Sequence, residues 1–245
     1  MAESTVSRYL SLVPAAGVGS RFGAALPKQY VPIAGRCVLE HSLRRLLAAP
    51  QIFQVAVVLA PGDEWFERHI RLPENLAARL MALRCGGASR AESVANGLNA
   101  LLAQRLAREG DKILVHDAAR CCLPHEALQR LLDEAGEHPV GGILALPAAD
   151  TLKRDNGSGC IAETVSRSGL WQAQTPQLFA AGLLQRALAA ANPAEITDEA
   201  SAIERLGLQP LLVQGDSRNL KLTWPADEQI ARLLLQEEAG CKSRL

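Results

Sequence analysis

Residues 13–30 read Val-Pro-Ala-Ala-Gly-Val-Gly-Ser-Arg-Phe-Gly-Ala-Ala-Leu-Pro-Lys-Gln-Tyr, and this stretch decides the fold class. A short apolar segment leads into a loop with small residues at Ala15, Ala16, Gly17, Gly19 and Gly23. Small residues let a backbone approach a ligand closely, and free N–H groups in such a loop can hold an anion. Arg21 and Lys28 add two cations with no carboxylate between them. The stretch therefore predicts a β–α loop that binds several phosphate charges, with an ordinary glycine-rich turn as the alternative.

Two well-known phosphate-binding loops do not match this stretch. The P-loop requires G-x-x-x-x-G-K-[ST], and the chain contains no Gly-Lys-Ser or Gly-Lys-Thr. The dinucleotide fingerprint requires G-x-G-x-x-G and an acidic residue at the tip of the next strand. Here Phe22 takes the place of the third glycine, and the next predicted strand ends in Ala60-Pro61-Gly62. Both a P-loop enzyme and a dehydrogenase are therefore disfavoured.

The composition limits the class of protein. A chain of 245 residues, 48% of them hydrophobic, is long enough for one α/β core, and we predict a single domain over residues 1–245. The formal net charge is zero and aromatic residues make up 4%, which argues against nucleic-acid binding. The sequence shows no signal-peptide pattern and no long apolar run, so we expect a cytoplasmic protein without a membrane partner. The six cysteines show no C-x-x-C spacing, which favours free thiols over a zinc site.

Apolar runs alternate with amphipathic segments along the chain. The predicted strands cover residues 9–13, 54–59, 81–85, 112–115, 142–146, 170–174 and 211–213. The predicted helices cover residues 39–48, 64–70, 91–107, 124–135, 180–191 and 225–238, and another helix begins at residues 197–200. This alternation predicts an α/β fold, a Rossmann-like, mostly parallel sheet with helices on both faces.

The alternation breaks at residues 148–169. A polar, glycine-containing turn is flanked by residues 151–153 and 161–165, which alternate as half-buried strands do. We interpret this segment as a β-hairpin inserted into the sheet domain, with a surface loop as the alternative. Because an isolated hairpin buries little surface, we expect it to be a dimerisation arm that packs on another subunit.

Polar residues follow two of the predicted strands. Asp117, just after the strand at 112–115, is a candidate Mg²⁺ ligand, because ligands bind at the carboxyl ends of parallel strands and Mg²⁺ prefers oxygen. The alternative is a helix N-cap. His116 is interpreted as a packed histidine and Arg120 as the partner in a structural salt bridge. The segment from Gly86 to Ser93 can present backbone groups and a hydroxyl to a base edge, but taken alone its pattern favours a glycine turn with a helix cap.

With these segments taken together, the chain resembles the 2-C-methyl-D-erythritol 4-phosphate cytidylyltransferases, which have the nucleotidyltransferase fold. The resemblance extends from about Tyr9 to Leu234. It rests on seven motifs in order: Pro14-Ala15-Ala16-Gly17-x-Gly19, Pro27-Lys28-Gln29-Tyr30, Gly87 to Ser93, Val115 to Arg120, Gln174-Thr175-Pro176-Gln177, Ile196 to Ser201 and Asn219-Leu220-Lys221.

The resemblance implies a reaction and roles for individual residues. The enzyme would transfer CMP from CTP to methylerythritol phosphate, releasing pyrophosphate, with Mg²⁺ as the cofactor and a homodimer as the assembly. Arg21 and Lys28 would be catalytic. The cytidine nucleotide would be bound by Pro14, Ala15, Ala16, Gly17, Gly19, Gly87, Ser93, Asp117 and Ala118, with Asp117 also holding the metal. The second substrate would be bound by Thr151, Arg167, Thr175, Thr197 and Lys221, with the two arm residues Thr151 and Arg167 reaching a neighbouring subunit.

The sequence departs from the family motifs at two positions, and two other functions remain as alternatives. Cys121 stands where the family usually has proline, and Arg218 stands where some members carry an acidic residue, so Asp216 is a doubtful second metal ligand. A ribitol 5-phosphate cytidylyltransferase would share the fold, although Ala118-Ala119-Arg120 favours the methylerythritol branch. A nucleotide-binding sensor without turnover is the alternative from another class; a sensor would not need cations such as Arg21 and Lys28 beside Asp117.

Overall fold

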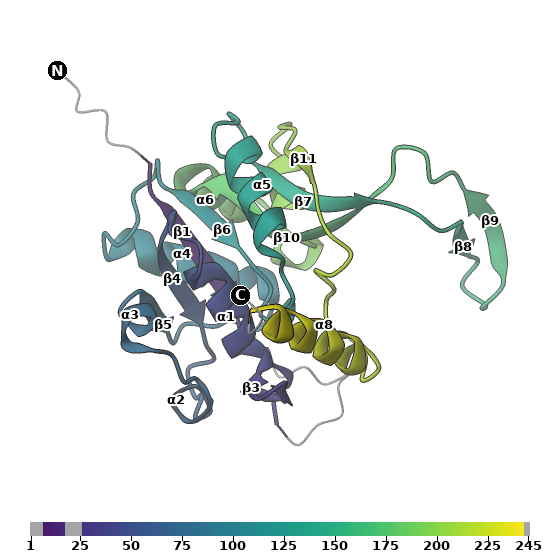
Figure 1. Ribbon diagram of the computed structural model, residues 1–245. Helices are drawn as coiled ribbons and strands as arrows, with labels where there is room; N and C mark the ends of the chain where they lie inside the picture. The colour runs from purple at the N-terminus through teal and green to yellow at the C-terminus, as the bar shows by residue number, and fades with distance from the viewer. Residues whose placement is uncertain (1–6, 18–25, 243–245) are drawn as a thin grey trace.

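The computed structural model describes residues 7–17 and 26–242. Within these residues, seven strands form a central sheet in the order β11-β7-β10-β6-β1-β4-β5 (Figure 1). The strands are β1 (Tyr9–Pro14), β4 (Ile52–Val58), β5 (Leu80–Leu83), β6 (Lys112–Val115), β7 (Gly142–Pro147), β10 (Trp171–Ala180) and β11 (Leu211–Gln214). Neighbouring strands are parallel except that β10 runs antiparallel to both β6 and β7. The prediction of a mostly parallel sheet is confirmed.

Helices cover both faces of the sheet because successive residues of each strand point to opposite sides. On one face, Val13, Val55 and Val57 pack in the same core as α1 (Val38–Leu47) and α5 (His125–Ala135). On the other face, Leu10 and Leu12 share a core with α4 (Arg90–Ala103), α6 (Ala181–Ala190) and α7 (Glu199–Glu204). A third, smaller cluster joins α8 (Asp227–Lys242) to the β2–β3 ribbon (Pro32–Ile33 and Arg36–Cys37). No helix in the described part of the chain is both long enough and apolar enough to cross a membrane.

Several predicted boundaries need correction. The helix expected at 64–70 is the single turn α2 (Phe66–His69), because the Asp63 carboxylate accepts hydrogen bonds from the amides of Trp65 and Phe66 and delays its start. A second short helix, α3 (Glu74–Ala77), was not predicted. The helix expected at 91–107 ends at Ala103, since Arg105 takes a left-handed conformation with φ of 59°.

The strand that precedes α6 is longer than predicted. The strand expected at 170–174 is the ten-residue β10. Its register against β7 shifts between Ala173 and Gln177. The sequence prediction ended at Gln174 because polar residues interrupt the apolar pattern there, although Gln174 and Gln177 are buried. These buried polar side chains belong to the site described below.

The predicted hairpin is present as β8 (Leu152–Asp155) and β9 (Ile161–Val165). The two strands pair antiparallel, and Arg154 Nε donates to Glu163 Oε1 across them at 2.6 Å. The hairpin lies between the end of β7 and the start of β10, and it projects from the body of the molecule (Figure 1). Ile161 is 64% exposed, so the arm presents apolar surface outward.

Candidate nucleotide-binding site

A cavity of about 370 Å³ lies at the carboxyl ends of β1 and β6. This is the edge at which parallel sheets bind their ligands. The described residues lining it include ten predicted from sequence: Pro14, Ala15, Ala16, Gly17, Lys28, Gly87, Ser93, Asp117, Ala118 and Lys221. Residues separated by about two hundred positions in the chain therefore meet in one place.

The loop after β1 forms one wall. Its backbone is fixed by the amide of Ala15, which donates to Val58 O at 2.8 Å, and by Gln29 Nε2, which donates to Ala15 O at 2.8 Å. Gln29 is buried and was not assigned a role from sequence. The wall therefore holds its shape through bonds to the neighbouring strand and to the Pro27–Tyr30 motif.

The turn before α4 forms the facing wall. The hydroxyl of Ser93 accepts from the amide of Gly87 at 3.1 Å and donates to Ser89 O at 2.9 Å. Ser89 caps the helix by accepting from the amide of Glu92. The segment from Gly87 to Ser93 forms the glycine turn and helix cap, and it also lines the cavity, where its backbone groups can meet a ligand.

Lys28 and Lys221 supply cations to the cavity. Lys28 Nζ donates to Leu222 O at 2.6 Å, which links the Pro27–Tyr30 motif to the segment that carries Lys221. Lys221 Nζ lies 2.7 Å from Asp117 Oδ2. A pair of ammonium groups beside a loop of small residues suits a polyphosphate ligand.

Asp117 is the buried anion at the centre of these cations. Its Oδ1 accepts from Arg90 Nε at 2.7 Å, and Arg120 Nε lies 3.9 Å from its Oδ2. Burial acts to raise the pKa of Asp117, but the charges of Arg90 and Lys221 outweigh it and hold that pKa well below its usual range. The carboxylate is therefore ionised at neutral pH. The structural ion pair predicted for Arg120 is present, although its Nη1 also donates to Asn219 O at 2.7 Å.

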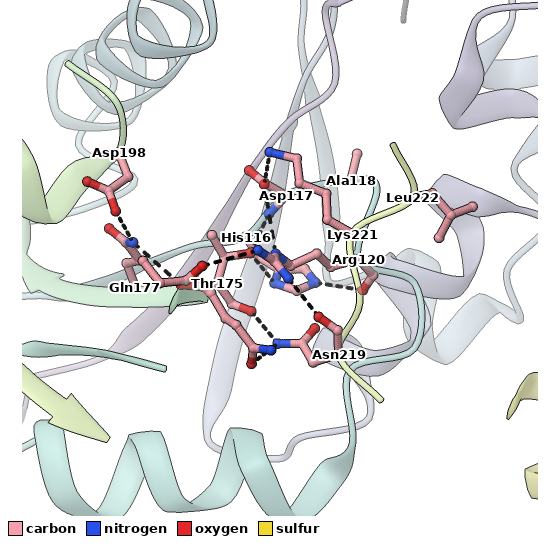
Figure 2. A network of polar contacts seen from close by, with 12 residues as sticks. His116, Asp117, Ala118, Arg120, Thr175, Gln177, Asp198, Asn219, Lys221 and Leu222 are labelled. Atoms are coloured by element: carbon pink, nitrogen blue, oxygen red, sulfur yellow. Dashed lines mark hydrogen bonds and ion pairs between the residues drawn. The ribbon is translucent and has the colours of Figure 1, made fainter. Parts of the chain in front are cut away.

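A buried hydrogen-bond network lies beneath Asp117 (Figure 2). Thr175 Oγ1 accepts from the amide of Asp117 at 3.0 Å and lies 3.1 Å from His116 Nδ1. His116 Nε2 lies 3.1 Å from Arg120 O, a carbonyl that can only accept. Nε2 therefore carries the proton, and Nδ1 accepts from Thr175. His116 is a packed, hydrogen-bonded residue, as predicted.

The other predicted site residues are not among the described residues that line the cavity. Thr175 is 4% exposed and lies under Asp117, so its hydroxyl supports the nucleotide site from below. Thr197 is exposed and immediately precedes Asp198, the N-cap of α7. Thr151 and Arg167 are exposed on the arm and are not among the described residues that line the cavity. Gly19 and Arg21 lie outside the described residues.

Arg90 and Glu199 are the principal residues near Asp117 that were not predicted from the sequence. Arg90 Nη1 and Nη2 donate to Glu199 Oε1 and Oε2 at 2.7 and 3.0 Å, while Nε reaches Asp117. Glu199 is completely buried. One sequence signal could have indicated a role for Arg90. It is the first residue of a helix, where the helix dipole disfavours a positive charge.

We predict a pH-dependent stability from His116. Burial lowers the pKa of His116 from 6.5 to about 4. Between these values the unfolded chain binds a proton that the folded chain does not, so stability falls as the pH drops from about 6.5 to about 4. The loss attributable to this residue is roughly 3 kcal/mol, at about 1.4 kcal/mol per pKa unit.

Urea unfolding from pH 7 to pH 4.5 measures this effect. His116→Gln, which cannot titrate, is expected to show a shallower dependence than the wild type. Equal slopes for the two proteins would show that His116 does not control acid stability. The exposed His125 serves for comparison, because His125→Gln should leave the slope unchanged.

The sheet and this cavity define a class of protein. A loop of small residues, two lysines and a buried carboxylate at the carboxyl ends of β1 and β6 are the features of a nucleotidyltransferase with an α/β fold.

The family model described as IspD, 2-C-methyl-D-erythritol 4-phosphate cytidylyltransferase, matches residues 10–237. A relative of that name from Laribacter hongkongensis is 57% identical over 230 residues, covering 94% of this chain and 97% of its own length. A relative of the same name from Neisseria gonorrhoeae is 56% identical over 228 residues, covering 93% and 97%. A crystal structure of a 4-diphosphocytidyl-2C-methyl-D-erythritol synthase aligns with a TM-score of 0.83 at 52% identity, covering 94% of this chain and 100% of that one.

The chain belongs to the IspD family of 2-C-methyl-D-erythritol 4-phosphate cytidylyltransferases. It is accordingly a nucleotidyltransferase of the non-mevalonate route to isoprenoid precursors. The family resemblance seen in the sequence is confirmed.

Proposed function

We propose that the cavity between the Ala15–Gly17 loop and the start of α4 is where this chain transfers CMP from CTP to methylerythritol phosphate. The observation that carries the proposal is the convergence of Lys28, Lys221 and Asp117 on one cavity lined by small residues. The loop amides and the Gly87 turn are suited to hold the cytidine nucleotide. Lys221 and the exposed Thr197 are suited to bind the acceptor.

The reaction requires little covalent chemistry from the protein. An oxygen of the acceptor phosphate attacks the α-phosphorus of CTP, the bond to the β-phosphate bridging oxygen breaks, and pyrophosphate leaves. Catalysis then consists of alignment and of neutralising charge on the transferring phosphorus and the leaving group. Lys28, together with Arg21, is proposed for that role because it lines the cavity beside the nucleotide loop.

We propose Mg²⁺ as the cofactor and Asp117 as its protein ligand. The described residues hold no group of three or more His, Cys, Asp or Glu side chains that could bind a metal ion. A single carboxylate nevertheless fits Mg²⁺, which is usually held by one or two carboxylates together with substrate phosphates and water. Bound there, the ion would neutralise phosphate charge. Asp216 is paired with Arg218 at 2.8 Å and is not among the described residues lining the cavity, so we do not assign it to the metal.

Pyrophosphate release tests the proposed function. The purified protein is incubated with CTP and Mg²⁺, with methylerythritol phosphate and ribitol 5-phosphate as parallel acceptors. We expect release with methylerythritol phosphate and not with ribitol 5-phosphate. Release with ribitol 5-phosphate alone would reassign the acceptor, and release with neither would favour a nucleotide sensor.

We propose a cytoplasmic homodimer in which each arm completes the neighbouring site. Thr151 and Arg167 are exposed on the arm together with the apolar side chain of Ile161, and Trp171 is exposed beside the arm at the start of β10. No disulfide joins the described residues Cys37, Cys85, Cys121, Cys122 and Cys160, which suits a reducing compartment. Mixing inactive Lys28→Ala subunits with inactive Arg167→Ala subunits tests the shared site. Mixed dimers should recover activity, and the absence of recovery would count against the arm's role.

Gly86→Ala is expected to weaken CTP binding. A Cβ at Gly86 would overlap the Cβ of Ala16 and approach Leu59 O at 2.8 Å, so the two walls of the cavity must separate. We expect a stability loss of roughly 1–3 kcal/mol, typical of overpacking, and a raised Kd for CTP by calorimetry. Gly110→Ala is the control, because its Cβ would meet nothing within 4 Å. An unchanged Kd in Gly86→Ala would show that wall spacing does not limit binding.

A further inference from the structure

Arg90 connects two carboxylates that come from distant segments. Its Nε donates to Asp117 Oδ1 at 2.7 Å, and its two terminal nitrogens bind both oxygens of Glu199. The Glu199 side chain is completely buried, and that of Arg90 is 26% exposed. One guanidinium therefore joins the start of α4, the loop after β6 and the start of α7.

Neither helix stability nor overall stability explains this arrangement. Arg90 is the first residue of α4, where the helix dipole disfavours a positive charge. A buried ion pair is also weak evidence for net stabilisation, because removing two charges from water offsets most of their attraction. A role in the site accounts for the pair better than a role in holding the fold.

The geometry fixes the orientation of the Asp117 carboxylate. Because Glu199 occupies both terminal nitrogens of Arg90, only Nε is directed at Asp117. Oδ1 is held by that bond, while Oδ2 faces Lys221 Nζ at 2.7 Å. Glu199 thus determines that Asp117 binds the Nε edge of the guanidinium. Arg90 in turn determines that Oδ2 is the carboxylate oxygen that faces Lys221.

The same pair fixes the segment that precedes α7. Glu199 is the first residue of α7, and Asp198 is its N-cap within a capping box. Gln177 of β10 holds this turn, since its Nε2 donates to Asp198 Oδ2 at 2.8 Å (Figure 2). Its Oε1 accepts from the amide of Ala200 at 2.9 Å. Thr197 lies two residues before Glu199, so its position relative to Asp117 depends on the Arg90 bridge.

We infer that Arg90 and Glu199 are positioning residues that hold the acceptor-binding segment at Thr197 in register with the nucleotide-binding Asp117. The inference rests on the proposed function. An acceptor phosphate must approach the α-phosphorus in line, and small misplacements of reacting groups cost large factors in rate. Glu199 is completely buried and is not among the described residues lining the cavity, so it acts on that alignment through Arg90, which does line it.

Glu199→Gln tests the inference, because it keeps the side-chain shape and removes the charge that organises Arg90. We expect kcat/KM for methylerythritol phosphate to fall roughly 10–100-fold, as for a small misalignment. The Kd for CTP, measured by calorimetry, should stay close to the wild-type value. Arg90→Lys keeps the charge but cannot bind both oxygens of Glu199, so it should lower kcat/KM for methylerythritol phosphate in the same way. The Kd for CTP is compared in Glu199→Gln alone, because Arg90 itself lines the cavity.

Glu195→Gln is the matched control. Glu195 makes an exposed ion pair with Arg205 at 2.8 Å, and it lies four residues before Glu199 without a bridge to Asp117. Its kinetic constants should remain those of the wild type. Wild-type turnover with methylerythritol phosphate, run in parallel, tests the proposed function separately.

Two outcomes would overturn the inference. In the first, Glu199→Gln and Arg90→Lys both retain wild-type kcat/KM for methylerythritol phosphate. In the second, activity is lost only in proportion to the unfolded fraction seen by circular dichroism and returns on cooling. If Glu199→Gln does not fold, the kcat/KM of folded Arg90→Lys for methylerythritol phosphate decides between a positioning role and a role in stability alone.

Discussion

Lys28→Ala is expected to lower kcat by roughly 10²–10³, the range seen when one preorganised charge-stabilising group is removed from an active site. The Kd for CTP should change much less. Lys28 lines the cavity beside the nucleotide loop, and its Nζ donates to Leu222 O at 2.6 Å. Within a partly buried site an ammonium acts more strongly on developing charge than it does in water. Steady-state kinetics combined with calorimetric CTP binding measures both quantities.

Lys112→Ala is the control for this prediction. Lys112 begins β6, so it lies at the end of the strand opposite the cavity, and its replacement makes the same change in net charge. Its kinetics should match those of the wild type. If Lys28→Ala weakens CTP binding as much as it lowers turnover, Lys28 contributes uniform binding rather than transition-state stabilisation.

Arg90→Met is expected to lower the free energy of unfolding by about 3–5 kcal/mol, the usual cost of removing one partner of a buried ion pair. The substitution leaves the completely buried Glu199 carboxylate without its bidentate partner. Asp117 would lose one of its cations but keep Lys221. Urea unfolding at pH 7 measures the change.

A double variant and a surface control isolate the cause. Arg90→Met combined with Glu199→Leu should regain most of the lost stability, because replacing both partners by apolar residues is often neutral. It should not regain activity. Arg205→Met removes the exposed pair with Glu195, and surface pairs contribute about 0–1 kcal/mol. A loss in Arg205→Met as large as that in Arg90→Met would contradict the burial argument.

The sequence predicted the sheet and much of the cavity because both depend on local patterns. The strands at 112–115 and 142–146 are short apolar runs, and Asp117 lies two residues after the end of the first. Parallel strands bring their carboxyl ends to one edge, so Asp117 and the Ala15–Gly17 loop were predictably close.

The remaining features depend on contacts between distant segments. Nothing local shows that Arg90 meets Glu199, 109 residues further along the chain. The motif assigned Thr175 to the acceptor, and no local pattern shows that its hydroxyl also accepts from the amide of Asp117. Such pairings are decided by how α4, α7 and β10 pack together, and residue type and spacing do not specify that packing.

The construction of the arm also has a consequence for how this family can diversify. The strands β7 and β10 are neighbours in the sheet and pair from Trp171 with Pro147, so the arm is an excursion between two strands that are already joined. Each doubling of such a connection costs only about 0.6 kcal/mol in chain entropy. Insertions or deletions at the tip around Gly157 therefore leave the sheet and its cavity intact. Thr151 and Arg167 flank the paired strands β8 and β9 on the side away from the tip, so a change of length at the tip need not displace them.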